Sequence, residues 1–239
     1  MRLNFIKKII FAILFLLPNI YALEKGNVYL EMGGGYKTGD FGTSSRTNLY
    51  YESPSLGYIT STYDVNITLP YLSLTTGSNN VNDIGDTILN VNFEVIPEEN
   101  NNFGLDSAIT LKLPTGNENK GLSTGNRDYG TFISFQKSLK EIKLSLSTGF
   151  IKTGDSALQS YDDILPYGLT LSKIFAITNI YASLEGRKYL SINGSNPLAF
   201  YMGFFRILNK QYSLKGNTFL GLNKDSPDFG IGLGVVRWF

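Results

Sequence analysis

The 239-residue sequence contains no cysteine and no histidine. Without cysteine there can be no disulfide framework and no thiolate nucleophile or metal ligand. Without histidine the chain lacks the usual general base of hydrolases and the commonest metal ligand. Neighbouring carboxylates at 98–99 and 162–163 fall in expected loops, where hydration explains them better than catalysis. We therefore expect that the protein is not an enzyme.

Phosphate-binding and metal-binding motifs are equally scarce. The glycines at 230–234 recur at every second position and no helix follows them, so they indicate a strand and not a nucleotide loop. The segment NKDSPD at 223–228 carries oxygen ligands that could hold Ca²⁺, but a solvated turn is the simpler interpretation. We expect neither a metal nor a cofactor.

Long apolar runs are missing after the first 22 residues, so no helical membrane span is expected. Residues 1–22 combine basic residues, a short apolar stretch at 9–17 and a small residue at Ala22, which is typical of a secretory signal peptide. Its removal would change the formal net charge from +1 to −2, because it carries three of the basic residues and no acidic one. Such a chain has no basic field with which to bind nucleic acid.

The residues that are abundant favour β-structure. The chain has 25 Gly, 16 Phe and 15 Tyr, whereas charged residues make up only 17%. Polar and apolar residues alternate in most segments, as in LDSAITLKL at 105–113 and IKLSLSTGF at 142–150, and this period of two predicts strands. About twelve strands are expected, near 27–36, 46–60, 64–74, 83–95, 103–113, 128–138, 141–152, 163–173, 177–189, 197–208, 211–223 and 227–239.

The connections between these strands alternate in length. Those after the even-numbered strands are mostly short, whereas those after the odd-numbered strands are mostly longer, as at 75–82, 114–127 and 153–163. Outer-membrane barrels have short periplasmic turns and longer external loops. A water-soluble β-sandwich also alternates, but its strands are shorter and fewer. We predict an all-β fold, a transmembrane antiparallel up-and-down β-barrel formed by residues 23–239.

The final residues, DFGIGLGVVRWF, form an amphipathic strand that ends the chain. Five apolar side chains alternate there with three glycines and are expected to face lipid: Phe229, Ile231, Leu233, Val235 and Phe239. An aromatic terminal residue preceded by alternating apolar residues resembles the signal that bacterial assembly machinery reads when it inserts barrels. The expected location is the bacterial outer membrane, and the expected partners are its lipid, the barrel-assembly machinery and a small-molecule solute.

Alternation also places a set of charged residues on the inner faces of the strands. These expected lumen-lining residues are Asp64, Asp86, Glu94, Asp106, Lys112, Lys143, Glu185, Arg187 and Lys215. They could form ion pairs that fill a narrow lumen, or they could line a pore and select its permeant. Twelve strands lie between the number that side chains can fill and the number that leaves an aqueous channel, so both alternatives stay open.

Three short motifs give the chain a family resemblance. A Gly-Asp pair opens one strand, a Leu-Pro-Thr-Gly segment ends the next, and Asp-Tyr-Gly starts a third; the residues are Gly85, Asp86, Leu113, Pro114, Thr115, Gly116, Asp128, Tyr129 and Gly130. In this order, over roughly 55–152, the chain resembles outer-membrane transporters assigned to the meta-pathway of phenol degradation. The resemblance implies a signal-directed barrel that passes small hydrophobic or aromatic molecules.

The function expected from the sequence is passive passage of small solutes through this barrel. No energy-coupling motif is present, so the solute gradient would supply the driving force. The alternative is a structural or interaction barrel whose lumen is filled by its own side chains and whose external loops bind a partner.

Overall fold

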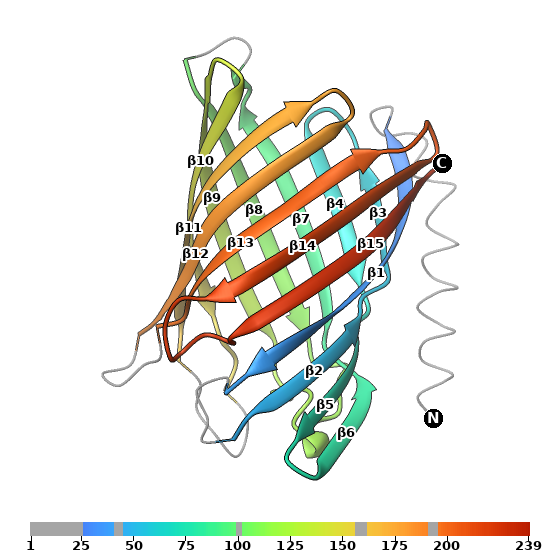
Figure 1. The fold of residues 1–239 in the computed structure, drawn as a ribbon, viewed down its shortest axis with the longest axis vertical. Helices are drawn as coiled ribbons and strands as arrows, with labels where there is room; N and C mark the ends of the chain where they lie inside the picture. Colours follow the sequence, from blue (N-terminus) through green and yellow to red (C-terminus); the bar gives the residue numbers. More distant parts are fainter. Residues whose placement is uncertain (1–25, 41–44, 99–101, 156–161, 191–195) are drawn as a thin grey trace.

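A computed structural model of the chain describes residues 26–40, 45–98, 102–155, 162–190 and 196–239. These residues form fifteen strand segments, which Figure 1 shows wrapped into a barrel. The segments are β1 (Asn27–Gly39), β2 (Thr47–Glu52), β3 (Ser55–Ile59), β4 (Tyr63–Thr68), β5 (Tyr71–Thr76), β6 (Asn79–Ile84), β7 (Thr87–Ile96), β8 (Gly104–Leu113), β9 (Asp128–Leu139), β10 (Ile142–Lys152), β11 (Ile164–Phe175), β12 (Thr178–Tyr189), β13 (Leu198–Ile207), β14 (Tyr212–Gly221) and β15 (Phe229–Trp238). The expected signal peptide lies outside the described residues and stays a prediction.

The barrel closes because its first and last strands pair. β15 is antiparallel to β1 from Tyr29 opposite Trp238 to Thr38 opposite Phe229. Every other neighbouring pair is also antiparallel. β2 with β3, β4 with β5, and β6 with β7 are each one strand interrupted by two residues. The fold is therefore a closed barrel of twelve antiparallel strands, as predicted.

Chain connections differ in length between the two ends of the barrel. The start of β1 and the end of β15 lie at the same end, at the top of Figure 1, where the turns include two-residue connections at 140–141 and 176–177. The opposite end carries the longer connections, including 114–127 with its short 3₁₀ helix, Glu118–Lys120. By the pattern of known barrels, the first end is periplasmic and the second is external.

One predicted external connection is wrong. The sequence suggested a connection at 75–82, but β5 continues to Thr76 and β6 begins at Asn79, with a tight turn at 77–78. Gly77 adopts a φ of +60° there, a conformation that glycine takes without steric cost. The run of Asn residues that suggested a loop instead continues the barrel wall outward as a hairpin.

Side-chain exposure follows the strand alternation. In β15, Leu233 is 60% exposed and Ile231 is 48% exposed, while Gly230, Gly232 and Gly234 between them are buried. An outward belt of apolar side chains suits a hydrocarbon environment, which accepts apolar but not unsatisfied polar groups. No helix among the described residues is long and apolar enough to cross a membrane.

Cross-strand pairs of glycine and an aromatic residue recur around the barrel. Seven such pairs are directly opposite in the register: Gly35 with Tyr51, Gly57 with Tyr29, Gly149 with Phe132, Gly186 with Tyr167, Gly203 with Tyr181, Gly216 with Phe204 and Gly230 with Phe219. In each pair, a Cβ added to the glycine would lie within 2.8 Å of the ring or its hydroxyl. The rings thus cover the glycines, an arrangement that fixes register in curved sheets.

The segments β2, β5 and β6 form an external extension, which projects beyond the rest of the barrel at the bottom of Figure 1. Three aligned interruptions, at 53–54, 69–70 and 85–86, separate it from the barrel proper. Its inner face carries the apolar side chains of Leu49, Leu72, Leu74 and Val81, which are register partners or lie two residues apart. Its outer face carries the polar residues Asn48, Ser73 and Asn82 together with the exposed rings of Tyr50 and Tyr71. Polar residues mixed with tyrosine suit a position at the edge of the lipid, where barrels carry aromatic girdles.

Replacing Gly203 by Ala tests the glycine–aromatic pairs. The added Cβ would lie 2.4 Å from the Tyr181 hydroxyl and 2.7 Å from the Gly216 carbonyl oxygen, so the strands must shift. We expect a loss of about 1–3 kcal/mol in the free energy of unfolding, measured by urea titration in phospholipid vesicles.

Gly33→Ala is the matched control, because its nearest contact would be 3.4 Å away. Its free energy of unfolding should stay within about 1 kcal/mol of wild type. Equal losses in the two variants would show that the ring contact is not what requires glycine.

Candidate functional site: the barrel lumen

The lumen contains two large hollows, one toward each end. The outer cavity, about 790 Å³, opens among the external connections and is lined mainly by residues of β10, β11, β12 and β13, with Lys37 of β1 and Phe219 of β14. The inner cavity, about 570 Å³, opens at the periplasmic turns and is lined by residues of β4, β7, β8, β9 and β10. Phe132 and Ser147 line both cavities, so these two residues mark the boundary between them.

Carboxylates dominate the inner cavity. Asp64 accepts hydrogen bonds from the Tyr29 hydroxyl at 3.0 Å and from the Asn66 and Asn92 amides at 3.3 Å each. Asp106 accepts a hydrogen bond from the Gln136 amide. Four of the predicted lumen charges gather here: Asp64, Glu94, Asp106 and Lys143. The cavity therefore holds three carboxylates and one ammonium, which gives it a net negative charge.

Side-chain hydrogen bonds continue this network from β4 through β7 to β8. The Asn90 amide donates to Asn66 at 3.0 Å, and the Thr110 hydroxyl donates to Asn90 at 2.8 Å. These residues are register partners on β4, β7 and β8. These hydrogen bonds therefore join side chains of neighbouring strands along the wall and do not cross the lumen.

Lys112 forms the most enclosed ion cluster of the protein that the structure describes. Its ammonium lies 3.1 Å from Asp86 and 2.9 Å from Asp128, and it donates a hydrogen bond to Thr124 at 2.7 Å. The Asp86 side chain is only 9% exposed. Lys112, Asp86 and Asp128 come from three different parts of the sequence, so the cluster ties β8 and β9 to the interruption between β6 and β7.

The residues of the three sequence motifs meet around this cluster. The Thr115 hydroxyl lies 2.7 Å from that of Thr87 and donates to the Gly85 carbonyl at 3.1 Å, and the Gly116 amide donates to Asp86 at 3.1 Å. A side chain at Gly116 would collide with the Leu122 carbonyl oxygen at 2.8 Å. Tyr129, by contrast, points outward and is 54% exposed. The motifs therefore build the wall at a strand interruption, and their contacts among the described residues include no cavity-lining role.

The 114–127 connection fastens the free side of the external extension. β6 pairs with β5 but has no ladder with β8. In its place, Asp83 accepts a hydrogen bond from the Asn117 amide at 3.0 Å and forms an ion pair with Lys120 at 3.2 Å. The Lys120 ammonium also donates to the Asn82 carbonyl at 3.0 Å. The Asn117 hydrogen bond, with smaller contributions from the Ile84 amide and Lys120, lowers the pKa of Asp83 to about 2.

A third hollow of about 240 Å³ contains the ion pair of Glu31 and Lys215, whose charged atoms are 2.5 Å apart. Lys215 belongs to the predicted set, but Glu31 was missed. Glu31 lies two residues after Tyr29 on β1 and therefore on the same face. The period-two argument would have placed its side chain inside the barrel. Lys37, on the same face of β1, was also missed.

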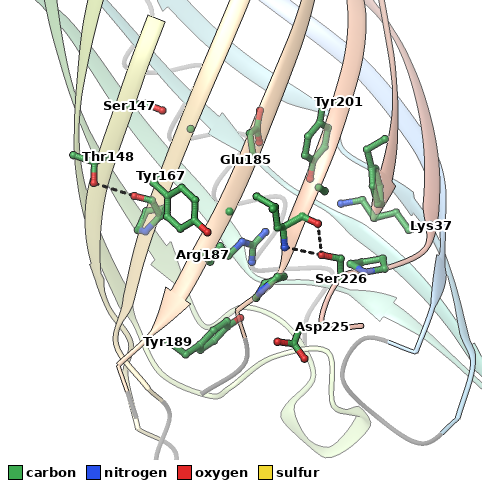
Figure 2. A pocket seen from close by; sticks show the side chains of 18 of the residues that line it. Lys37, Ser147, Thr148, Tyr167, Glu185, Arg187, Tyr189, Tyr201, Asp225 and Ser226 are labelled. Atoms are coloured by element: carbon green, nitrogen blue, oxygen red, sulfur yellow. Dashed lines mark hydrogen bonds between the residues drawn. The ribbon is translucent and has the colours of Figure 1, made fainter. Parts of the chain in front are cut away.

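The nine predicted lumen charges thus separate into four groups. The first lies in the inner cavity, the second is the Lys112–Asp86 cluster in the wall, and the third is Lys215 with Glu31. The fourth group, Glu185 and Arg187, lies in the outer cavity, where Figure 2 shows both side chains with Lys37 and Tyr201. Their role in selectivity stays a prediction.

The terminal strand places its apolar residues as the sequence suggested. Phe229, Ile231, Leu233, Val235 and Phe239 are all at least 37% exposed. Arg237 also points outward, and its guanidinium lies 4.7 Å from the centre of the Phe239 ring. The Phe239 amide donates to the Val28 carbonyl at 3.0 Å. The last residue is therefore tied into β1, while the assembly signal itself stays a prediction.

Comparisons with known proteins place this barrel among outer-membrane barrels by fold. No family model matches the chain, and no curated protein matches it. A solved outer-membrane channel, COG4313 from Pseudomonas putida F1, is similar with a TM-score of 0.75 at 16% identity over 91% of this chain and 97% of that one. The NanC porin is similar with a TM-score of 0.60 at 10% identity over 86% and 98%. The CymD monoaromatic hydrocarbon channel reaches 0.50 at 7% identity over 91% and 89%.

Replacing Lys112 by Gln should destabilise the barrel strongly. The change leaves Asp86 and Asp128 without their shared cation at sites no more than 19% exposed. We expect the free energy of unfolding in vesicles to fall by about 3 kcal/mol.

Asp86→Asn should cost only about 1 kcal/mol. Lys112 keeps Asp128 in this variant, and the amide carbonyl introduced at position 86 can still accept the hydrogen bond from Gly116. If Asp86→Asn proved the more damaging change, Lys112 would not be the centre of the cluster.

The contact between Asp83 and the 114–127 connection should resist acid. A lowered pKa means that the contact contributes stability above the ordinary Asp range and loses it as the pH falls through the lowered value, about 2. The chain has no cysteine, so nitroxide labels can be attached to cysteines introduced at Asn80 and Asn119. Pulsed electron paramagnetic resonance should give a narrow distance distribution down to about pH 4 and broadening only at lower pH.

Asp83→Asn removes the titrating group as a control. It should give a distribution that is the same at every pH tested. If the distance distribution between the two labels broadened at about pH 6 in the protein that keeps Asp83, Asp83 would be ruled out as the titrating group.

Proposed function

We propose that the protein is a passive outer-membrane channel for small hydrophobic or aromatic solutes. The observation that carries this proposal is the pair of cavities, one toward each end of the lumen, whose linings share Phe132 and Ser147. In such a barrel, a solute has only the boundary at these two residues to pass between the two hollows. The solute gradient then supplies the driving force.

The rival proposal, a barrel filled by its own side chains, requires a continuous network of ion pairs across the lumen. Among the described residues, Lys112 pairs with carboxylates beside the wall, and Lys215 pairs with Glu31 on the adjoining part of the sheet. Within the same described part of the chain, neither Lys143 nor Arg187 forms an ion pair that would bridge the lumen. This separation supports a channel over a filled barrel.

The preference for hydrophobic or aromatic solutes rests on the walls that a solute would meet. The external extension presents Leu49, Leu72, Leu74 and Val81 on its inner face. Further in, the outer cavity is lined by the rings of Tyr201, Phe219 and Phe132. Apolar surface at an entrance favours solutes that gain by leaving water. The family resemblance and the similarity in fold to a monoaromatic hydrocarbon channel support the same class.

The fold also supports an outer-membrane location for this channel. The outward apolar belt would contact outer-membrane lipid, and the barrel-assembly machinery would insert the chain after export. Among the solved structures similar in fold are two channels and a porin, which supports transport.

Single-channel recording in planar bilayers tests the route through the lumen. Wild-type protein should give discrete conductance steps, and Phe132→Ala should raise the conductance by roughly a factor of two, because Phe132 stands where the cavities meet. Phe135→Ala is the matched control. Phe135 lies on the same strand but faces outward, with 48% exposure, so its loss should leave the conductance unchanged.

The result that would contradict the channel is silence from a barrel shown to be folded and inserted. An equal rise in both variants would place the ion path somewhere other than the junction at Phe132. Silence would turn attention to the external connections as a partner-binding surface.

A further inference from the structure

Two cations that line the outer cavity form no ion pair with a carboxylate among the described residues. The Lys37 side chain from β1 and the Arg187 side chain from β12 both line this cavity, and Figure 2 shows them pointing into the same hollow. Within the part of the chain that the structure describes, no ion pair involves either of them. Lys112 and Lys215, by contrast, each lie within 3.1 Å of a carboxylate oxygen. The outer cavity therefore brings together two cations that form no ion pair among the described residues, whereas the inner cavity has one such cation, Lys143, among three carboxylates.

Aromatic rings surround one of these cations. The Lys37 ammonium lies 5.4 Å from the centre of the Tyr51 ring and 5.7 Å from that of Phe219. The Phe219 and Tyr201 rings are 5.2 Å apart with an interplanar angle of 35°. A flat apolar surface and an ammonium thus lie side by side. This combination recognises a molecule that carries a ring next to an anionic group.

Three acidic residues, Asp162, Glu185 and Asp225, also line the cavity, so the positive charge is local to Lys37 and Arg187 and does not extend over the whole lining. Glu185 lies two residues from Arg187 on β12 and accepts a hydrogen bond from the Ser183 hydroxyl at 2.8 Å. Asp225 accepts a hydrogen bond from the Asn196 amide at 2.8 Å and lies nearer the outside than Arg187, as Figure 2 shows. Asp162 also lines the cavity and has a partner of its own. At the level of Lys37, Arg187 and Glu185, two positive charges face one negative charge.

We propose that the outer cavity is a binding site for small aromatic carboxylates. The carboxylate would lie between Lys37 and Arg187, where the guanidinium can donate two parallel hydrogen bonds. The ring would lie against Phe219 and Tyr201. The cavity, at about 790 Å³, is within the usual size range of small-molecule sites. This inference rests on the proposed function and deepens it by naming the solute class that the channel retains.

The acidic inner cavity determines what happens to a bound anion. Asp64, Glu94 and Asp106 lie beyond Phe132, with Lys143 as the one basic residue among the lining residues described. An anion that leaves the outer cavity inward must therefore enter a region of net negative charge. A bound aromatic acid should remain long enough to interrupt the ion current, so it should appear first as a blocker.

Benzoate added to the external side of a planar bilayer tests the site. We expect benzoate to interrupt the single-channel current at concentrations at least about tenfold lower than acetate, which has the charge without the ring, or phenol, which has the ring without the full charge. Lys37→Gln and Arg187→Gln should each weaken the benzoate block by about tenfold. Lys188→Gln is the matched control, because Lys188 is adjacent to Arg187 on β12 but on the opposite, outward face.

Some outcomes would overturn the proposal. Equal block by acetate and benzoate would reduce the site to simple attraction of anions, and equal block by phenol would remove the role of the cations. These comparisons use the unchanged protein, so they decide the matter even if a variant fails to fold. A variant series in which Lys188→Gln weakens the block as much as Arg187→Gln would also overturn it.

Binding measured without any current separates this inference from the proposed function. Saturation-transfer nuclear magnetic resonance on the detergent-solubilised barrel should detect benzoate, with a weaker signal in Lys37→Gln and Arg187→Gln. If benzoate binds but the bilayer shows no conductance, the site stands and the channel fails. If the bilayer conducts but benzoate gives no transferred signal, the channel stands and the site fails.

Discussion

Closure of the β-sheet is the constraint on which the rest of the structure depends. A strand in hydrocarbon cannot leave its amide and carbonyl groups unpaired, since no water is there to bond them. The ladder between β1 and β15 removes the two edges that a flat sheet would expose. The edge that remains without a ladder, on β6, belongs to the external extension, where Asp83, Asn117 and Lys120 fasten it with side chains.

Closure also decides what the inside can contain. Once apolar side chains are committed to the outer face, alternation sends every second residue into a narrow lumen. Glycines covered by aromatic rings keep parts of that space small, as at Gly230 beneath Phe219. Between such positions lie polar and charged side chains, and their spacing along the axis leaves two separate hollows with different charged residues. Lys37 and Arg187 face the outer hollow, whereas carboxylates dominate the inner one.

Much of this architecture could be predicted from the sequence, because the alternation of polar and apolar residues can be seen directly in it. The twelve strands and the inward direction of Asp64 or Lys143 follow from counting. The interruptions at 53–54, 69–70 and 85–86 could not be located in this way, since they depend on where the sheet must bend. Lys37 was missed because the first strand was expected to end at residue 36, whereas β1 continues to Gly39. The grouping of Lys112 with Asp86 and Asp128 was also out of reach, since it requires the register of strands distant in sequence.

The pairing of β1 with β15 has a consequence for the order in which the molecule can form. It joins Tyr29 to Trp238, so the contact that completes the barrel is among the most distant in the sequence. Hairpins such as β5 with β6 need only a two-residue turn and can form in microseconds. Closure must wait until the last strand is in place. Until then β1 is an open edge that could pair with any other strand it meets, and the chain depends on being kept apart from its neighbours for that interval.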